Sequence, residues 1–267
     1  MVFVRQFVRF GWIQALCCIF PVVIFGTLGL TKIVEIPGLQ RYDFILIMCL
    51  LAQFGMAVFK LETLDELKVI CLFHLIGLAL ELFKVHMGSW SYPEEGWSKI
   101  FGVPLYSGFM YASVASYICQ AWRRFDLQIT GWPGSIWTVL ICAAIYGNFF
   151  THHFIGDYRW VLTALLVVIF FRTKVYFTLH TKTYWMPLTL SFLLIGFFIW
   201  VAENISTFLG AWSYPDQEHV WRIVHIGKIS SWFLLVVISI IIVAQLKHVK
   251  KEWVNPRQQE PDNQIDS

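Results

Sequence analysis

Two stretches of this chain, ELFKVHMGSWSYPE at residues 81–94 and ENISTFLGAWSYPD at residues 203–216, decide how the fold is predicted. Each begins with a glutamate near the end of a long apolar run and closes on Trp-Ser-Tyr-Pro. Glycine followed by an aromatic pair and proline is typical of a helix end, with Trp and Tyr at the level of the lipid headgroups. This interpretation explains the closing turns, and it leaves the two glutamates unexplained.

The composition indicates a membrane protein. Hydrophobic residues make up 58% of the 267 and charged residues 14%, with a mean hydropathy of +0.64, whereas roughly a quarter of the residues in soluble domains are charged. The net charge of +3 comes from short basic clusters between apolar runs, so it implies no nucleic-acid partner. All six cysteines lie within apolar runs and form no CxxC spacing, which predicts buried thiols and no disulfides.

Apolar runs of about 20 residues can cross the hydrocarbon layer of a bilayer. They predict an all-α, polytopic transmembrane bundle of about eight helices. The expected spans are residues 10–31, 42–60, 67–86, 101–122, 135–154, 158–178, 186–208 and 223–246. The sixth has the shortest run without charge, because Arg172 and Lys174 must reach the interface; without it, seven spans remain.

The domain organisation and the orientation follow from the same runs. We expect residues 1–246 to form a single transmembrane domain and residues 247–267 to form a polar, disordered tail. Eight alternating spans place most lysines and arginines on the side that holds both termini. The positive-inside rule then predicts a multi-pass plasma-membrane protein with both termini in the cytoplasm.

The two glutamate stretches also predict an internal duplication. Gly88–Pro93 and Gly210–Pro215 match at five of six positions, and each follows its glutamate at the same distance. Four spans separate the copies. We therefore expect pseudo-repeats of about 10–122 and 135–246 with the same orientation, related by an axis along the membrane normal. If the sixth span were not a crossing, the repeats would be inverted.

Glu81 and Glu203 are the principal candidate functional residues. A charged side chain within a span costs about 2.5 to 3.5 kcal/mol on insertion scales, so an intramembrane carboxylate indicates function. Lys84 lies three residues after Glu81, and a structural ion pair is the alternative interpretation there. Glu203 has no such neighbour and is followed by Asn204.

A histidine cluster is expected at the same depth as the glutamates. In HHFIGDYR, residues 152–159, His153 and Asp157 stand at i, i+4, a spacing that suits two ligands of one metal or a histidine–carboxylate relay. His152, His153 and Asp157 are therefore candidates for catalysis and for metal binding. The sequence identifies no particular cofactor.

His74 and His225 extend the candidate site, each with simple packing as the alternative. His74 lies two turns before Glu81 on the same helix face, and His225 lies near the outer end of the last span. We group both with Asn204 as candidate substrate-binding residues.

Three runs resemble a known family: HLIGLALELFKVHMGSWSYPE at 74–94, FGVPLYSGFMYASVASYICQAWRRFDL at 101–127 and GNFFTHHFIGDYRW at 147–160. They are similar to the YoaT-like bacterial membrane proteins, over nearly the whole chain except its tail. The resemblance implies a multi-pass plasma-membrane protein and carries no catalytic residues.

A more local resemblance covers about 30 residues. An intramembrane glutamate, a Gly-x-Trp-x-Tyr turn and FGVPL at 101–105 are similar to membrane carotenoid hydratases and heterodimer-type lycopene cyclases. Those enzymes protonate or hydrate the ends of polyenes, which would give Glu81 and Glu203 acid and base roles. The chain departs from the cyclases at Pro104, which is followed by Leu105 rather than by glutamate.

The sequence thus supports three functional hypotheses. The first is an intramembrane hydratase, cyclase or isomerase that acts on an apolar, isoprenoid-like lipid, with Trp90, Tyr92, Trp212 and Tyr214 stabilising a developing carbocation. The second is a proton- or cation-coupled transporter that uses the same residues. The third is a non-catalytic scaffold or sensor. The expected partner is the lipid bilayer, and the sequence predicts no oligomeric state.

Overall fold

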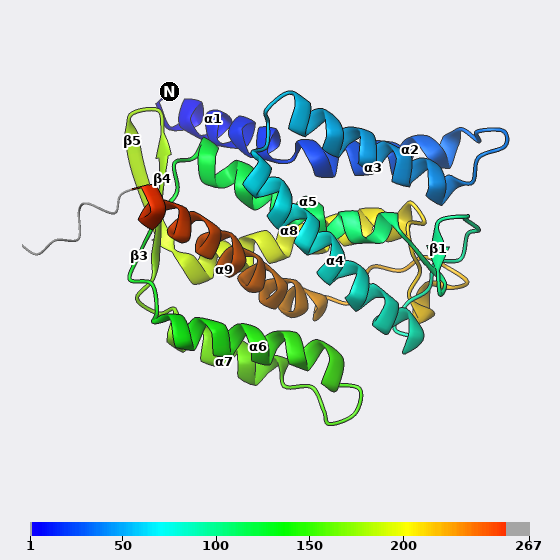
Figure 1. Cartoon of the computed structure of the whole chain (residues 1–267). Helices are drawn as coiled ribbons and strands as arrows, with labels where there is room; N and C mark the ends of the chain where they lie inside the picture. The colour runs from blue at the N-terminus through cyan, green and yellow to red at the C-terminus, as the bar shows by residue number, and fades with distance from the viewer. Residues whose placement is uncertain (1, 255–267) are drawn as a thin grey trace, which may run out of the picture.

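The computed structural model describes residues 2–254, which form a bundle of helices with a small antiparallel sheet (Figure 1). The helices are α1 (Val2–Cys17), α2 (Ile19–Ile33), α3 (Arg41–Val58), α4 (Leu64–His86), α5 (Tyr106–Arg124), α6 (Ser135–Thr151), α7 (Arg159–Ile169), α8 (Leu188–Phe208) and α9 (Lys228–Val254). The strands are β1 (Lys99–Ile100), β2 (Val103–Pro104), β3 (Gln128–Thr130), β4 (Lys174–Leu179) and β5 (Lys182–Pro187), and a short 3-10 helix covers Pro215–Gln217.

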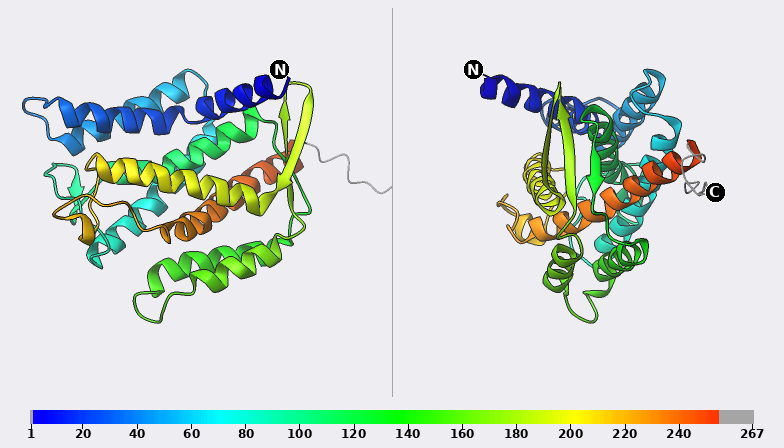
Figure 2. Two further views of the ribbon diagram at one scale, coloured as in Figure 1. Left: turned by 180° about the vertical axis from the view of Figure 1, so that it is seen from behind. Right: turned by 90° about the vertical axis from the view of Figure 1, so that its left-hand side faces the viewer.

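Successive helices run back and forth between two ends of the molecule (Figures 1 and 2). One end carries the β3-β4-β5 sheet, the start of α1 and the last part of α9, and we call it the sheet end. The other carries the connections at residues 34–40, 87–105, 152–158 and 209–227, and we call it the turn end. Both WSYP turns and the HHFIGD cluster therefore lie at the turn end.

Three helices are long and apolar enough to cross a membrane, namely α3, α4 and α8. The pair α1 and α2, bent by 70° at Cys18, makes a fourth if it counts as one span. Helices α6, α7 and the apolar part of α9 are shorter apolar helices. The structure therefore supports membrane association through three or four helices, and the predicted eight crossings are not confirmed.

Helix α5 is deeply buried, although it is not among the helices that are apolar enough to cross a membrane. It packs against α1, α2, α3, α4 and α9, and buries small side chains such as Ala112, Ala115 and Ser116 completely. Small residues let neighbouring helices approach closely. Because protein surrounds α5, it does not need the apolar surface of a lipid-facing helix.

The prediction of residues 158–178 as one continuous membrane-spanning helix is wrong. Helix α7 ends at Ile169, and residues 174–179 form β4, which pairs with β3 and β5. Val175 and the aromatic residues Tyr176 and Phe177 favour a strand over a helix, and His180 turns the hairpin with a φ of 63°. The all-α prediction therefore holds for most of the chain but misses this sheet.

The predicted tail begins too early. Helix α9 continues to Val254, so residues 247–254 are helical rather than disordered. The rest of the predicted tail, 255–267, lies outside the described residues.

Gly77 permits the closest contact between α4 and α5. A Cβ atom at this position would lie 2.4 Å from Cγ of Tyr111. Overpacking of this kind costs about 1 to 3 kcal/mol. We therefore expect Gly77→Ala to lower the thermal unfolding temperature of the purified protein in detergent.

Gly55→Ala is the matched control, because a Cβ at Gly55 of α3 meets nothing within 4 Å. Alanine in place of a helical glycine stabilises by about 0.5 to 1 kcal/mol, so this variant should unfold at the same or a higher temperature. Equal unfolding temperatures for the two variants would contradict the close packing at Gly77.

Candidate functional site

The two repeated turns have the same backbone structure. The glycine of each has a positive φ, 68° in the first copy and 74° in the second, a conformation that glycine adopts without steric cost. Ser89 N–H donates to the Lys84 carbonyl, and Ala211 N–H donates to the Ser206 carbonyl, both at 2.9 Å. Each bond closes its helix in the manner of a Schellman motif.

The two turns pair with each other. Ser91 and Ser213 form an antiparallel bridge in which each N–H donates to the other carbonyl at 2.9 Å. Beside the bridge, the rings of Trp90 and Tyr214 meet edge to face, with centroids 6.0 Å apart. The repeated sequences thus build one structure at the turn end. The duplication of the whole halves stays a prediction.

Glu81, in α4, is buried at 3% exposure and accepts three hydrogen bonds. Trp90 Nε1 and Tyr92 OH donate to Oε2 at 2.7 and 2.8 Å, and Tyr111 OH donates to Oε1 at 2.9 Å. Two of these donors belong to the turn that follows Glu81 in the chain. The turn therefore folds back to hold the carboxylate that precedes it.

Glu203, in α8, is buried at 2% exposure and accepts two hydrogen bonds. Tyr214 OH donates to Oε1 at 2.5 Å, and Trp232 Nε1 of α9 donates to Oε2 at 2.8 Å. Tyr92 and Tyr214 hold corresponding positions in the two copies. Burial raises the pKa of both tyrosine hydroxyls well above the usual value, so they stay protonated and act as donors.

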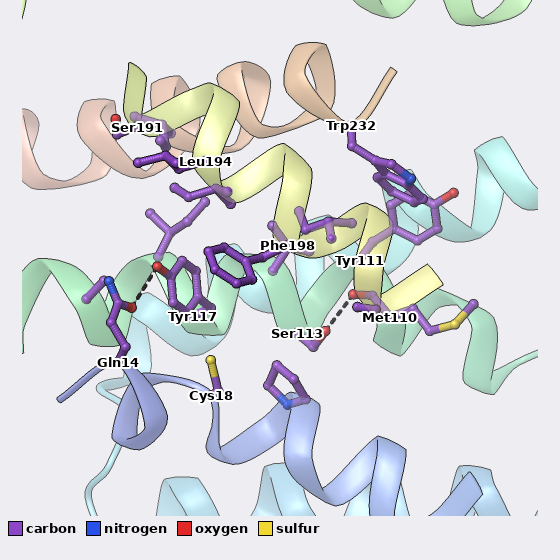
Figure 3. A pocket seen from close by; sticks show the side chains of 18 of the residues that line it. Gln14, Cys18, Met110, Tyr111, Ser113, Tyr117, Ser191, Leu194, Phe198 and Trp232 are labelled. Atoms are coloured by element: carbon purple, nitrogen blue, oxygen red, sulfur yellow. Dashed lines mark hydrogen bonds between the residues drawn. The ribbon is translucent and has the colours of Figure 1, made fainter. Parts of the chain in front are cut away.

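An apolar cavity of about 770 Å³ extends from the sheet end to the two glutamates. Helices α1, α2, α5 and α8 form most of its wall, as the labelled side chains Cys18, Ser113, Tyr117 and Phe198 illustrate (Figure 3). Glu81 and Glu203 line it together with Trp90, Tyr111, Trp212, Tyr214 and Trp232. Glu81 and Glu203 therefore form the polar end of a single apolar cavity.

A second, smaller cavity of about 170 Å³ adjoins the first. Its wall includes Glu203, Trp90, Tyr111, Tyr214 and Trp232, which also line the apolar cavity. The remaining wall is strongly polar and includes Lys84, His152, Arg159, Lys228 and Ser231. Glu203 thus faces an apolar chamber on one side and a cationic one on the other.

The alternative ion pair between Lys84 and Glu81 is wrong. Lys84 Nζ lies 3.1 Å from Nε2 of His153 and 3.2 Å from Nε2 of His152. Among the described residues, no carboxylate lies within 4.0 Å of this ammonium group. Lys84 therefore connects the histidine cluster to the site and leaves Glu81 to its aromatic donors.

Asp157 does not join the histidines in a metal site. Its carboxylate pairs with Arg159 at 2.5 Å and accepts from the Arg159 N–H at 3.0 Å. Burial opposes its ionisation, but the bonds from Arg159 outweigh this effect and lower the pKa of Asp157. Within the part of the chain that the structure describes, no three His, Cys, Asp or Glu side chains are grouped to hold a metal ion.

Three further candidates lie away from the carboxylates. The ring of His74 packs at a tilt against that of Phe109, with centroids 4.4 Å apart, and His225 is exposed and accepts from the Gly227 N–H. Asn204 donates to the Trp200 carbonyl and accepts from the Val224 N–H, both at 2.8 Å. These residues line neither cavity, so packing and backbone positioning account for them.

Sequence reasoning missed Tyr111, Trp232, Arg159 and Lys228 as members of the site. Tyr111 and Trp232 lie in later helices and have no counterpart in the repeated turns. Lys228 and Arg159 were not among the predicted site residues. Their positions at the first residue of α9 and of α7, at the depth of the glutamates, are the signal that could have identified them.

The fold and the site define a membrane-associated helical protein with an apolar chamber that ends at two buried carboxylates. A family model described as a protein of unknown function, DUF817, matches residues 6–240, and the chain belongs to this family. The chain is 62% identical over 249 residues to the uncharacterized protein YoaT of Bacillus subtilis strain 168. The aligned region covers 93% of this chain and 94% of the relative. The predicted YoaT-like membership is confirmed.

The fold also has a counterpart among solved structures. The crystal structure of a cross-linked MvINS trimer is similar with a TM-score of 0.50 and 11% sequence identity. The match covers 75% of this chain and 98% of that one. At this identity the similarity concerns the arrangement of helices alone.

A single substitution can measure how much the hydrogen bond from Tyr111 to Glu81 contributes to stability. Tyr111→Phe removes the donor to Oε1 and leaves a buried carboxylate oxygen without its partner, which costs about 1 to 3 kcal/mol. We expect a lower thermal unfolding temperature in detergent. Tyr158→Phe is the control, because its hydroxyl makes only an exposed 3.4 Å bond; equal effects of the two variants would show that the Glu81 bond is not stabilising.

Proposed function

We propose that this protein is a multi-pass plasma-membrane enzyme that carries out acid–base chemistry on an apolar, isoprenoid-like lipid. The observation that carries the proposal is the position of Glu81 and Glu203 at the same end of one apolar cavity. Ligand sites of small molecules are mostly apolar, with a few convergent polar groups. The cavity has this composition, because its wall is apolar apart from a few polar side chains and the glutamate end.

The length of the cavity suits a chain-like ligand. Along α5 its wall extends from Met110 to Phe125, which corresponds to roughly 22 Å at 1.5 Å per residue. At the sheet end Val175 and Phe177 line it, and at the turn end the carboxylates do. An extended hydrocarbon chain therefore fits with one end beside Glu203 and the other near the sheet.

The hydrogen bonds favour different roles for the two carboxylates. Glu81 accepts three hydrogen bonds, which favour the anionic form of its carboxylate. An anionic carboxylate held in this way would stabilise the positive charge that develops on the substrate. Glu203 has two donors and faces both cavities, which suits a group that gives and receives a proton. His152 lines the same polar cavity as Glu203.

The chemical step would begin with proton transfer from Glu203 to a carbon–carbon double bond of the lipid. The π electrons form the new C–H bond and leave a carbocation, which Trp90, Trp212 and Tyr214 can stabilise through their ring faces. Loss of a neighbouring proton to the Glu203 carboxylate gives a double-bond isomer. Addition of water with loss of its proton gives an alcohol. Both routes restore the protonated glutamate.

A proton- or cation-coupled transporter is the second candidate. The observation that favours it is again Glu203, which lies between an apolar cavity and a polar one. Ionisable groups at such boundaries form ion and proton pathways in transporters. In that case the apolar cavity would hold the transported molecule.

Glu203→Gln tests the catalytic role. We expect it to abolish the change in lipid composition that the parent protein causes when it is overproduced, because an amide cannot transfer the proton. Mass spectrometry of whole-cell lipid extracts measures this change. Glu62→Gln is the control, because Glu62 is a carboxylate of 5% exposure that lines neither cavity.

The outcomes separate the two candidates. A lipid change that disappears in Glu203→Gln but persists in Glu62→Gln supports the enzyme. Unchanged extracts together with the loss of a pH-dependent uptake favour the transporter. If Glu203→Gln folds and neither property changes, both candidates are excluded.

Ser113→Trp tests the occupancy of the cavity. Ser113 lines the cavity from α5 (Figure 3), and a tryptophan there would fill the space of a bound chain. We expect the purified variant to carry at most about a tenth as much co-purified lipid as the parent, as quantified by mass spectrometry. Leu193→Trp, at an exposed position of α8 outside the cavity wall, should keep the parent's lipid content. An equal lipid content in both variants would contradict occupancy of this cavity.

A further inference from the structure

The polar cavity beside Glu203 is lined by cations from three different helices. Lys84 comes from the last turn of α4, Arg159 from the first turn of α7 and Lys228 from the first turn of α9. Ser89 and Ser231 add hydroxyl groups to the same wall, and Glu203 is its only carboxylate. Three cationic side chains and two hydroxyl groups therefore line a space of about 170 Å³, whose wall also includes Leu80, Phe149 and Leu235.

Lys84 is the least expected member of this wall, because it is only 5% exposed. Its ammonium group lies 3.1 to 3.4 Å from the imidazole nitrogens of His152 and His153. An imidazole that accepts from an ammonium group is neutral. Among the residues whose side chains the structure describes, no carboxylate lies within 4.0 Å of this lysine, so its positive charge is buried without a direct ion pair, a costly arrangement.

Lys228 is a second lysine in the wall of the same cavity. Its ammonium group lies 4.5 Å from the centre of the Tyr214 ring and 5.4 Å from that of Trp90. In the described chain it also has no carboxylate within 4.0 Å. The aromatic donors of Glu81 and Glu203 already occupy those carboxylates. Two ammonium groups therefore face the cavity without a direct ion pair.

Arg159 differs because Asp157 neutralises one side of its guanidinium group. Its other side remains directed toward the cavity wall, where Nη1 donates to Ser231 Oγ at 2.7 Å. A fixed guanidinium group of this kind offers the fork of donors that suits phosphate and carboxylate. The arginine thus adds a pre-positioned contact to the two ammonium groups.

We propose that the polar cavity binds the anionic headgroup of an amphiphile, of the phosphate class, whose apolar chain occupies the neighbouring cavity. This inference rests on the proposed function and names its substrate class. The two cavities share Trp90, Tyr111, Glu203, Tyr214 and Trp232, so one molecule can extend through both. Its headgroup would then be fixed by Lys84 and Lys228, with the first bonds of its chain beside Glu203.

The test compares three probes on the full-length protein in detergent by titration calorimetry. The probes are farnesyl monophosphate, farnesol, which has the same chain without the charge, and inorganic phosphate, which has the charge without the chain. We expect farnesyl monophosphate to bind at least 10-fold more tightly than either of the others. Charge-assisted bonds to phosphate are the stronger class of hydrogen bond, so the advantage should come from the headgroup.

The variants Lys84→Met and Lys228→Met should remove most of this advantage and leave the affinity for farnesol unchanged. Lys182→Met is the matched control, because Lys182 is exposed in β5 at the sheet end, and it should bind all three probes as the parent does. Lys84→Met should also raise the unfolding temperature of the ligand-free protein, since it removes a buried cation. Lys228→Met preserves the test if Lys84→Met fails to fold.

Each contrary result has a separate meaning. Equal affinity for farnesyl monophosphate and farnesol overturns the headgroup site and leaves the apolar cavity of the proposed function intact. Inorganic phosphate that binds as tightly as farnesyl monophosphate indicates a site for a free anion and overturns the link to a chain. If neither farnesyl probe binds, the proposed function itself fails.

Discussion

The burial of two carboxylates in an apolar bundle is the constraint on which the rest of the structure depends. A carboxylate that is buried among apolar side chains must have its hydrogen bonds supplied by neighbouring protein groups, because an unpaired buried charge is costly. Each glutamate obtains a donor from the turn that follows it, Tyr92 for Glu81 and Tyr214 for Glu203. The helix must therefore end soon after the glutamate, and the chain must reverse sharply, which the left-handed glycine of each turn permits.

Pairing of the two turns then fixes the ends of α4 and α8 relative to each other. The Ser91–Ser213 bridge links the turns directly. Arg41 reinforces the second one, because its guanidinium group donates to the carbonyls of Leu209 and Gly210. With these ends held together, both carboxylates face the same chamber. Helices α1 and α2, which are bent relative to each other, form another part of the wall of the apolar cavity.

The sequence predicted the helical, membrane-associated character and the repeated turns, because hydropathy and a short repeated motif are local signals. The functional roles of Glu81 and Glu203 stay a prediction. The sequence prediction missed the β3-β4-β5 sheet, since the periodicity of a short apolar run such as 174–179 does not distinguish a strand from part of a helix, and the strand preference of its residues was not taken into account. It also missed Tyr111 and Trp232. Their role depends on how α5 and α9 pack against the turns, and packing between distant segments leaves no spacing in the chain.

Burial of a carboxylate does not by itself identify a functional site, and the opposite end of the bundle shows why. Glu62 is buried there and accepts from Gln53 and Ser116, and Glu66 closes a capping box with Thr63. These bonds complete the connection between α3 and α4, and neither glutamate lines a described cavity. Glu81 and Glu203 differ in what they face. Glu81 and Glu203 are held by donors at the end of an apolar cavity, whereas Glu62 and Glu66 complete a connection between two helices.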